Sequence, residues 1–274
     1  MKKNIRMIAL DMDGTLLHNH GTLSKEGKDA LTQLRTNGVR VVIASGRPFY
    51  SIARILPDTL FDYAACANGQ YIYDAKGNLL SAKKDLQEME IKELMRYLYQ
   101  YPMVMSYSDG EQFLHTCSPA YHAFASLFSF ARRVYHKLRG VPFYKETITP
   151  LAKVHLTSTS KLCFAGSPKT LRKFVQHVNT KKYSTFFVSP GWLEIQTAGV
   201  SKGAALKDIA KLENIDISMT AAIGDGENDI PMIQAAGIGV AMGNAMNSVK
   251  ACADEIALPN SKDGAVRWII DNLL

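Results

Sequence analysis

IRMIALDMDGT, residues 5–15, sets the class of fold that we expect for this chain. Its apolar run, residues 5–10, ends directly at two acids, which predicts a buried strand followed by a turn. Asp11 and Asp13 share one side if strand geometry persists, and Gly14 permits the turn. Two carboxylates this close repel each other unless a proton or a hard cation such as Mg²⁺ intervenes. The segment therefore indicates a metal site, although a helix cap with solvated acids would fit the same residues.

Strand and helix patterns alternate outward from this segment. The first 70 residues follow the order strand, helix, strand, helix, strand, with the second helix expected over residues 49–56. The alternation resumes with a helix over residues 202–212, and a later strand is expected over residues 238–241. This order predicts an α/β fold with a doubly wound parallel sheet and right-handed crossovers. Between the two pieces, hairpin and helix patterns predict a mixed α+β insertion of domain size, which includes helices over residues 87–100 and 119–138. Because ligands bind at the carboxyl ends of strands in such sheets, Asp11 would lie at the binding edge.

The composition narrows the class of protein. The 274 residues allow one large domain or two modest ones, and 47% hydrophobic residues are enough for a sizeable core. The net charge of +7 favours anionic partners, but the basic residues form only isolated pairs, so we expect no nucleic-acid binding. We expect no membrane span and no signal peptide, because no long apolar run is present. The four cysteines lack metal-ligand spacing, which predicts buried thiols in a cytoplasmic protein.

Three further motifs offer groups that suit a phosphate and its metal. ASGRP at residues 44–48 follows a predicted strand, and the Ser45 hydroxyl with nearby backbone N–H groups forms an anion site. GDGEND at residues 224–229 places Asp225 and Asp229 at another strand end. Lys202 begins a predicted helix, where a cation opposes the helix dipole and so suggests a bound anion. Each motif alone also fits a plain turn, a helix cap or a surface lysine, but their coincidence favours a phosphate–Mg²⁺ site.

The segments DMDGTL, ASGRP, VSKGAAL and GDGENDIPM resemble, in this order, the four motifs of the haloacid dehalogenase superfamily. The motifs are similar to those of its Cof-type hydrolases, subgroup IIB. Asn68-Gly69, LEI at residues 193–195 and VAMGNA at residues 240–245 also look like this subgroup. The resemblance implies a Rossmann-like core domain formed by residues 1–83 and 190–274, and an inserted type-2 (C2B) cap domain at residues 84–189. The cap region is similar to the subgroup only in the order and position of its elements.

The resemblance also implies a role for each motif residue. It makes Asp11 the nucleophile and Asp13 the general acid and base. The implied Mg²⁺ ligands are Asp11, Asp225 and the backbone carbonyl of Asp13, with Asp229 orienting either the water shell of the metal or Lys202. The groups implied to bind the phosphoryl oxygens are Ser45, Gly46, Lys202, Asn228 and the Met12 N–H.

We therefore expect a Mg²⁺-dependent phosphatase that hydrolyses small phosphorylated metabolites through an aspartyl-phosphate. Sugar phosphates and cofactors such as FMN or pyridoxal phosphate are the substrates that the resemblance suggests, for a monomer or homodimer. A phosphomutase or phosphotransferase similar to phosphomannomutase shares the chemistry and stays an alternative, whereas a signalling receiver fits the later motifs poorly. No GxxxxGK[ST] loop is present, which disfavours a P-loop enzyme. The candidate substrate contacts in the cap are Tyr107, His115, Phe124, Arg132, Arg133 and Lys137.

Overall fold

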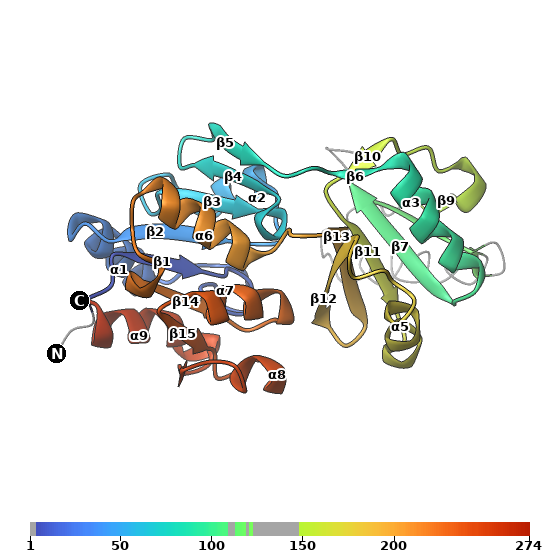
Figure 1. The fold of residues 1–274 in the computed structure, drawn as a ribbon. Helices are drawn as coiled ribbons and strands as arrows, with labels where there is room; N and C mark the ends of the chain where they lie inside the picture. Colours follow the sequence, from blue (N-terminus) through green and yellow to red (C-terminus); the bar gives the residue numbers. More distant parts are fainter. Residues whose placement is uncertain (1–3, 109–112, 119–120, 123–147) are drawn as a thin grey trace, which may run out of the picture. The chain divides into compact units, whose positions relative to one another are not determined.

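A computed structural model describes residues 4–108, 113–118, 121–122 and 148–274 of the chain (Figure 1). It contains two compact units. The first unit combines Met1–Lys83 with Gly199–Leu274, and the second is Lys84–Ala198. The helix that the sequence predicts over residues 119–138 falls almost wholly outside the described residues. No helix in the described part of the chain is long and apolar enough to cross a membrane.

An eight-stranded sheet in the order β16-β15-β14-β1-β2-β3-β4-β5 forms the centre of the first unit. Neighbouring strands from β16 to β3 run parallel, and β4 and β5 continue the sheet as an antiparallel hairpin. The strands are β1 (Met7–Leu10), β2 (Arg40–Ala44), β3 (Tyr63–Cys66), β4 (Tyr71–Asp74), β5 (Leu79–Ala82), β14 (Thr220–Gly224), β15 (Ile238–Ala241) and β16 (Glu255–Ile256). The predicted parallel α/β sheet is therefore confirmed.

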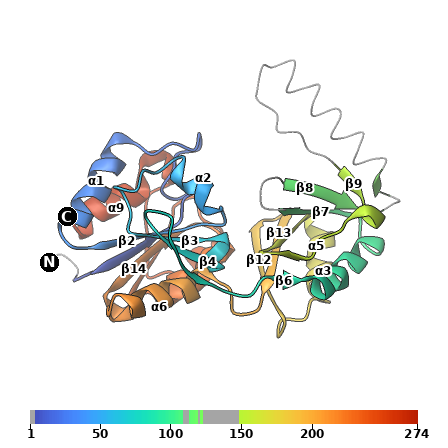
Figure 2. The same cartoon turned by 90° about the horizontal axis from the view of Figure 1, so that it is seen from above.

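Helices cover both faces of this sheet (Figure 2). They are α1 (Lys25–Thr36), α2 (Phe49–Ala53), α6 (Lys202–Leu212), α7 (Ile230–Ala235), α8 (Asn247–Lys250) and α9 (Gly264–Asn272). Side chains of β1 point alternately to the two faces, since Ile8 and Leu10 pack in one core cluster with α1 and α9. Met7 and Ala9 pack in a second cluster with α6. This burial on both sides explains why the strand is apolar throughout rather than alternating.

The register of the parallel strands brings distant segments to one edge. Leu10 of β1 lies opposite Ile223 of β14 and Ile43 of β2. The residues that follow these three positions therefore emerge together at the carboxyl edge of the sheet, where open α/β sheets bind ligands. All of the predicted motif residues belong to this first unit.

The second unit is built on a six-stranded sheet in the order β12-β13-β11-β7-β8-β9. Its strands are β7 (Met103–Ser108), β8 (Phe113–Cys117), β9 (Ile148–Pro150), β11 (Leu162–Gly166), β12 (Tyr183–Ser189) and β13 (Trp192–Thr197), and β6 (Leu86–Gln87) pairs separately with β10 (Ser158–Thr159). The helices α3 (Glu88–Met95) and α5 (Pro168–Val175) contribute Leu94 and Phe174 to its core. Because β13 pairs with β11 and β12, the unit extends to Ala198, beyond the boundary at residue 189 that the sequence suggested.

Several helix ends differ from the predicted ones for local reasons. The helix predicted over residues 49–56 ends at Ala53 as α2, because Pro57 has no N–H to donate to the Ala53 carbonyl four residues earlier. The helix predicted over residues 87–100 is α3 followed by a 3₁₀ segment, Arg96–Tyr99. By contrast, α6 and β15 have the predicted bounds.

Gly203 tests the contact between α6 and α7. A Cβ at Gly203 would lie 2.1 Å from the carbonyl oxygen of Pro231, so Gly203→Ala has to push the two helices apart. Alanine normally favours a helix over glycine, but we expect this substitution to lower the free energy of unfolding by about 1–3 kcal/mol. Gly27→Ala in α1 is the matched control, because its new Cβ meets the movable Leu23 side chain. Chemical denaturation of both variants checks this, and a neutral or stabilised Gly203→Ala would contradict it.

Candidate active site

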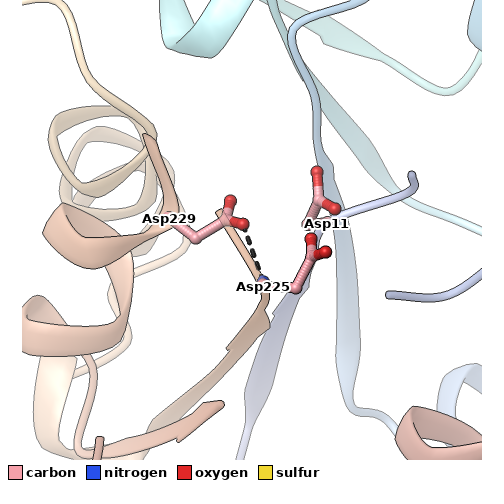
Figure 3. A group of neighbouring side chains, drawn as sticks. All are labelled: Asp11, Asp225 and Asp229. Carbon is pink, nitrogen blue, oxygen red and sulfur yellow. Dashed lines mark hydrogen bonds between the residues drawn. The ribbon is translucent and has the colours of Figure 1, made fainter. Parts of the chain in front are cut away.

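Three carboxylates converge at the carboxyl edge of the sheet in the first unit (Figure 3). Asp11 follows β1, Asp225 follows β14, and Asp229 ends the short 3₁₀ turn that precedes α7. One oxygen from each carboxylate lies within 4.8 Å of the others. In the described part of the chain, this is the group of acidic, histidine and cysteine side chains close enough to share a metal ion.

Lys202 supplies the positive charge at this cluster. It is the first residue of α6 and is 1% exposed. Its Nζ lies 2.6 Å from Asp11 Oδ1 and 2.5 Å from Asp229 Oδ1. The Ser201 hydroxyl caps the helix by accepting a hydrogen bond from the Ala204 N–H, so the lysine starts from a fixed backbone position.

The second oxygen of Asp229 fixes the loop that carries Asp225. Asp229 Oδ2 accepts hydrogen bonds of 2.9 Å from the backbone N–H groups of both Asp225 and Gly226. A side chain at Gly224 could not fit, because its Cβ would lie 2.4 Å from the Asp229 Cβ. Asp229 therefore holds the loop with one oxygen and Lys202 with the other.

The charges of the cluster do not balance within the protein. Burial raises the pKa of Asp11 well above its ordinary value against the opposing effect of Lys202, and Asp229 and Asp225 raise it further. Burial also raises the pKa of Asp225 to about 6, with a contribution from Asp229. Burial alone would lower the pKa of Lys202, but Asp11 and Asp229 raise it. Three carboxylates thus share one ammonium group, which leaves negative charge for a proton or a cation to neutralise.

The oxygen atoms of this cluster fit a magnesium ion. Mg²⁺ prefers carboxylate oxygens and water at about 2.0–2.1 Å, so two of its ligand atoms lie at most about 4.2 Å apart. The carboxylate oxygens need to move only slightly to meet that limit. Two side chains already orient Asp225: Thr15 Oγ1 donates to its Oδ1 at 3.3 Å, and Asn244 Nδ2 donates to its Oδ2 at 3.2 Å. Such outer hydrogen bonds commonly set the direction of a metal ligand.

Gly14 and Asp13 occupy the turn after β1. Gly14 has a φ of 80°, and a Cβ there would lie 2.3 Å from Asp225 Oδ2. Only glycine therefore fits at this position beside Asp225. The Asp13 side chain does not join the carboxylate cluster and is 55% exposed. It forms a two-pronged ion pair with Arg47, whose Nε and Nη2 each lie 2.7 Å from an Asp13 oxygen.

The other predicted phosphoryl-binding groups lie on the segments that follow β1, β2 and β14. Ser45 is buried directly after β2, and its Oγ accepts a hydrogen bond from the Arg47 N–H at 3.2 Å. Gly46 lies between them, and Met12, between Asp11 and Asp13, is fully buried. Asn228 is 7% exposed, and its Nδ2 donates to Asn68 Oδ1 at 3.1 Å. The roles of these residues stay predictions.

Among the described residues, sequence reasoning missed four side chains that contact the predicted site residues. They are Thr15, Arg47, Asn68 and Asn244. Arg47 lies inside the ASGRP motif, and the negative charge of DMDG could have pointed to it as a partner. The two asparagines belong to segments that look like the Cof-type subgroup, but nothing in the sequence indicates which groups their amides contact.

The candidate substrate contacts of the second unit are only partly described. The His115 Nδ1 is 2.7 Å from the Ser106 hydroxyl, and Tyr107 is buried in the core of that unit. The remaining candidates lie outside the described residues: Phe124, Arg132, Arg133 and Lys137.

Comparison with known proteins identifies the family. The sequence matches the family described as haloacid dehalogenase-like hydrolase over residues 8–269. It is 28% identical over 279 residues to the putative phosphatase YxeH of Bacillus subtilis (strain 168), covering 98% of each chain. It is 28% identical over 280 residues to the pyridoxal phosphate phosphatase YbhA of Escherichia coli (strain K12), covering 98% of this chain and 99% of that one.

A solved structure gives the same picture of the fold. The subclass IIB sugar phosphatase BT4131 superposes with a TM-score of 0.78 at 19% identity, covering 97% of this chain and 98% of its own. The family match includes all four motifs, and the likeness in fold extends over both units. The predicted superfamily and fold class are thus confirmed. The chain is an enzyme of the haloacid dehalogenase-like hydrolase family, and the curated relatives to which it is similar are phosphatases.

Proposed function

We propose that this protein is a Mg²⁺-dependent phosphatase that transfers a phosphoryl group to Asp11 and then to water. The observation that carries the proposal is the buried cluster of Asp11, Asp225 and Asp229 around Lys202 at the carboxyl edge of the sheet. A phosphate monoester is dianionic, so a carboxylate can approach it only where cations offset the repulsion. Lys202 and a divalent ion beside Asp11 would meet that requirement.

Asp11, Asp225 and the Asp13 backbone carbonyl would hold the Mg²⁺. When bound, the ion supplies positive charge that stabilises the phosphoryl oxygens during transfer. Asp229 would keep its place between Lys202 and the loop of Asp225, where it orients both. The donor set is made of oxygens only, which suits a hard cation rather than zinc or copper.

Asp11 and Asp13 divide the covalent chemistry. One Asp11 oxygen attacks the phosphorus, the bond from phosphorus to the leaving oxygen breaks, and Asp13 gives that oxygen a proton. Water then attacks the aspartyl-phosphate, the bond to Asp11 breaks, and Asp13 recovers a proton from the water. Both Asp13 oxygens accept hydrogen bonds from Arg47 in this structure, so Arg47 orients the side chain to which we assign the proton transfers.

The remaining motif residues would bind the phosphoryl group while it is transferred. Lys202 lies against Asp11 and can reach an oxygen of a phosphoryl group attached there. Ser45, Gly46, Asn228 and the Met12 N–H would donate hydrogen bonds to the other oxygens. Fixed donors of this kind stabilise a transition state because they need no reorganisation during the reaction.

The two units would divide the work between chemistry and substrate choice. We propose that residues 1–83 and the C-terminal segment form the catalytic core, and that the second unit is a cap that contacts the leaving group. The substrate class we propose is small phosphorylated metabolites, either sugar phosphates or cofactors. The similarity to a pyridoxal phosphate phosphatase supports a phosphorylated cofactor. Assays across a panel of such compounds would define the substrate, and release of free phosphate would separate a hydrolase from a phosphomutase.

The cellular setting is part of the same proposal. All four cysteines are free thiols, and the pKa of Cys66 is raised to about 12 by burial, which keeps that thiol unreactive. Free thiols suit a reducing compartment, so we propose a cytoplasmic enzyme. We also propose that it acts as a monomer or homodimer.

The nucleophile is tested by Asp11→Asn. An amide cannot form the acyl-phosphate, so we expect turnover to fall by at least about 10³-fold while the fold is retained. Release of inorganic phosphate from p-nitrophenyl phosphate with Mg²⁺ gives the measurement, and circular dichroism checks the fold. Asp58→Asn is the matched control, because the exposed Asp58 carboxylate lies outside the site. Wild-type turnover in Asp11→Asn would remove Asp11 from the nucleophile role.

The metal is tested by the pH dependence of Mg²⁺ binding. Asp225 titrates with a raised pKa of about 6, so at lower pH a proton occupies a site that the ion needs. We expect Mg²⁺ to bind about tenfold more weakly at about pH 5 than at about pH 7.5. Isothermal titration calorimetry gives the two affinities. Asp225→Asn should bind Mg²⁺ weakly at both values. Equal affinity at the two pH values, or full activity in EDTA, would contradict a metal at this cluster.

A further inference from the structure

The chain takes an unusual backbone conformation directly after β3. Three consecutive residues of the segment Ala67–Gly69 have positive φ angles of 47°, 58° and 91°. Glycine adopts such angles freely and asparagine tolerates them, but alanine does so at a cost. Residues held in this way persist only where the surrounding structure fixes them, and they gather at functional sites. All three residues of the segment are also buried, so neighbouring parts of the chain surround it.

The backbone of this turn holds the loop of Ser45. The Asn68 N–H donates to the Ser45 carbonyl at 2.9 Å, and the Ala67 N–H donates to the Arg47 carbonyl at 3.0 Å. These two bonds enclose the stretch of chain that contains Gly46. In this left-handed conformation both N–H groups point at that loop.

The side chain of the turn holds Asn228. Asn68 is 0% exposed, and its Oδ1 accepts a hydrogen bond of 3.1 Å from Asn228 Nδ2. An amide nitrogen carries two hydrogens in one plane. Fixing one of them on Asn68 sets the direction in which the other points. The contact joins segments that are 160 residues apart, and both partners are buried.

The third residue of the turn fits against the start of α6. A Cβ at Gly69 would lie 2.6 Å from the Ser201 carbonyl oxygen and 2.8 Å from the Ala205 Cβ. Only glycine allows this approach, and Ser201 directly precedes Lys202. One three-residue turn thus contacts the Ser45 loop, the Asn228 side chain and the helix that carries the lysine.

We propose that Asn68 is a positioning residue, which orients the Asn228 amide and the Ser45 loop for a phosphoryl group. The inference rests on the proposed role of these residues in phosphate binding. Glycine would satisfy the backbone of this turn, so a buried carboxamide at this position indicates a role for the side chain. The Asn68 side chain pairs with a residue of the GDGEND motif.

The experiment is a double-mutant cycle with Asn68→Gly and Asn228→Ala. Glycine keeps the left-handed backbone and its N–H, but removes the carboxamide. Binding of inorganic phosphate in the presence of Mg²⁺, measured by calorimetry, is the readout, together with the melting temperature. We expect Asn68→Gly to weaken phosphate binding by about three- to tenfold, the effect of one lost hydrogen bond. In the Asn228→Ala background, the same substitution should change the affinity little, because Asn68 acts through Asn228.

Asn214→Gly is the matched control. Asn214 is also an asparagine with a positive φ, 53°, but it is exposed beyond the end of α6. We expect that variant to bind phosphate as the wild type does. If Asn68→Gly does not fold, Asn68→Ala removes the same carboxamide with less backbone freedom and takes its place in the cycle.

Two results would overturn the inference: unchanged phosphate affinity in Asn68→Gly, or an equal loss in both backgrounds. The proposed function fails separately. A coupled cycle in a protein that releases no phosphate from monoesters would refute the phosphatase and leave the role of Asn68 standing. Hydrolysis of monoesters with an uncoupled cycle would refute the role of Asn68 alone.

Discussion

The carboxylate cluster of the first unit has more negative groups than the single buried lysine beside it can balance. Asp11, Asp225 and Asp229 share a single ammonium group, Lys202, at a buried place where unbalanced charge is costly. Their side chains would separate in water, so the packing around them has to hold them together. The Lys202 ammonium bridges two of the carboxylates, and the backbone N–H groups of the GDGEND loop engage the second oxygen of Asp229. What remains is a group of carboxylates with too little positive charge around it, which suits a small divalent cation.

The parallel sheet is the means by which this cluster is assembled. Asp11 and Asp225 are far apart in the sequence, but the register of β1 with β14 brings their strands to an end together. Glycines permit the approach, since side chains at Gly14 and Gly224 would collide with Asp225 and Asp229. Lys202 is the first residue of α6. The close fit of α6 on α7 at Gly203 sets its position. The close backbone contacts at these glycines therefore shape the fold and also position the groups that we propose to bind the metal ion.

Much of this arrangement could be predicted from the sequence because it follows from patterns along the chain. Apolar runs that end in acids placed β1 and β14, and the helical pattern from Lys202 gave the bounds of α6. Side-chain partners across the fold could not be predicted in this way. The two-pronged geometry of Asp13 with Arg47 and the contact of Asn68 with Asn228 depend on which segments meet in space, and no local pattern encodes that. The extent of the second unit was missed for the same reason, since β13 belongs to it only through pairing with β11 and β12.

The most direct measurement of the central claim is the location of a bound ion in crystals grown with Mn²⁺, which accepts the same oxygen ligands as Mg²⁺ and scatters anomalously. We expect one anomalous peak in contact with both Asp11 and Asp225, at about 2.1 Å from an oxygen of each. Density for Mn²⁺ only elsewhere on the protein, with Asp11 bound to Lys202 alone, would contradict the claim that this cluster of carboxylates is a metal site.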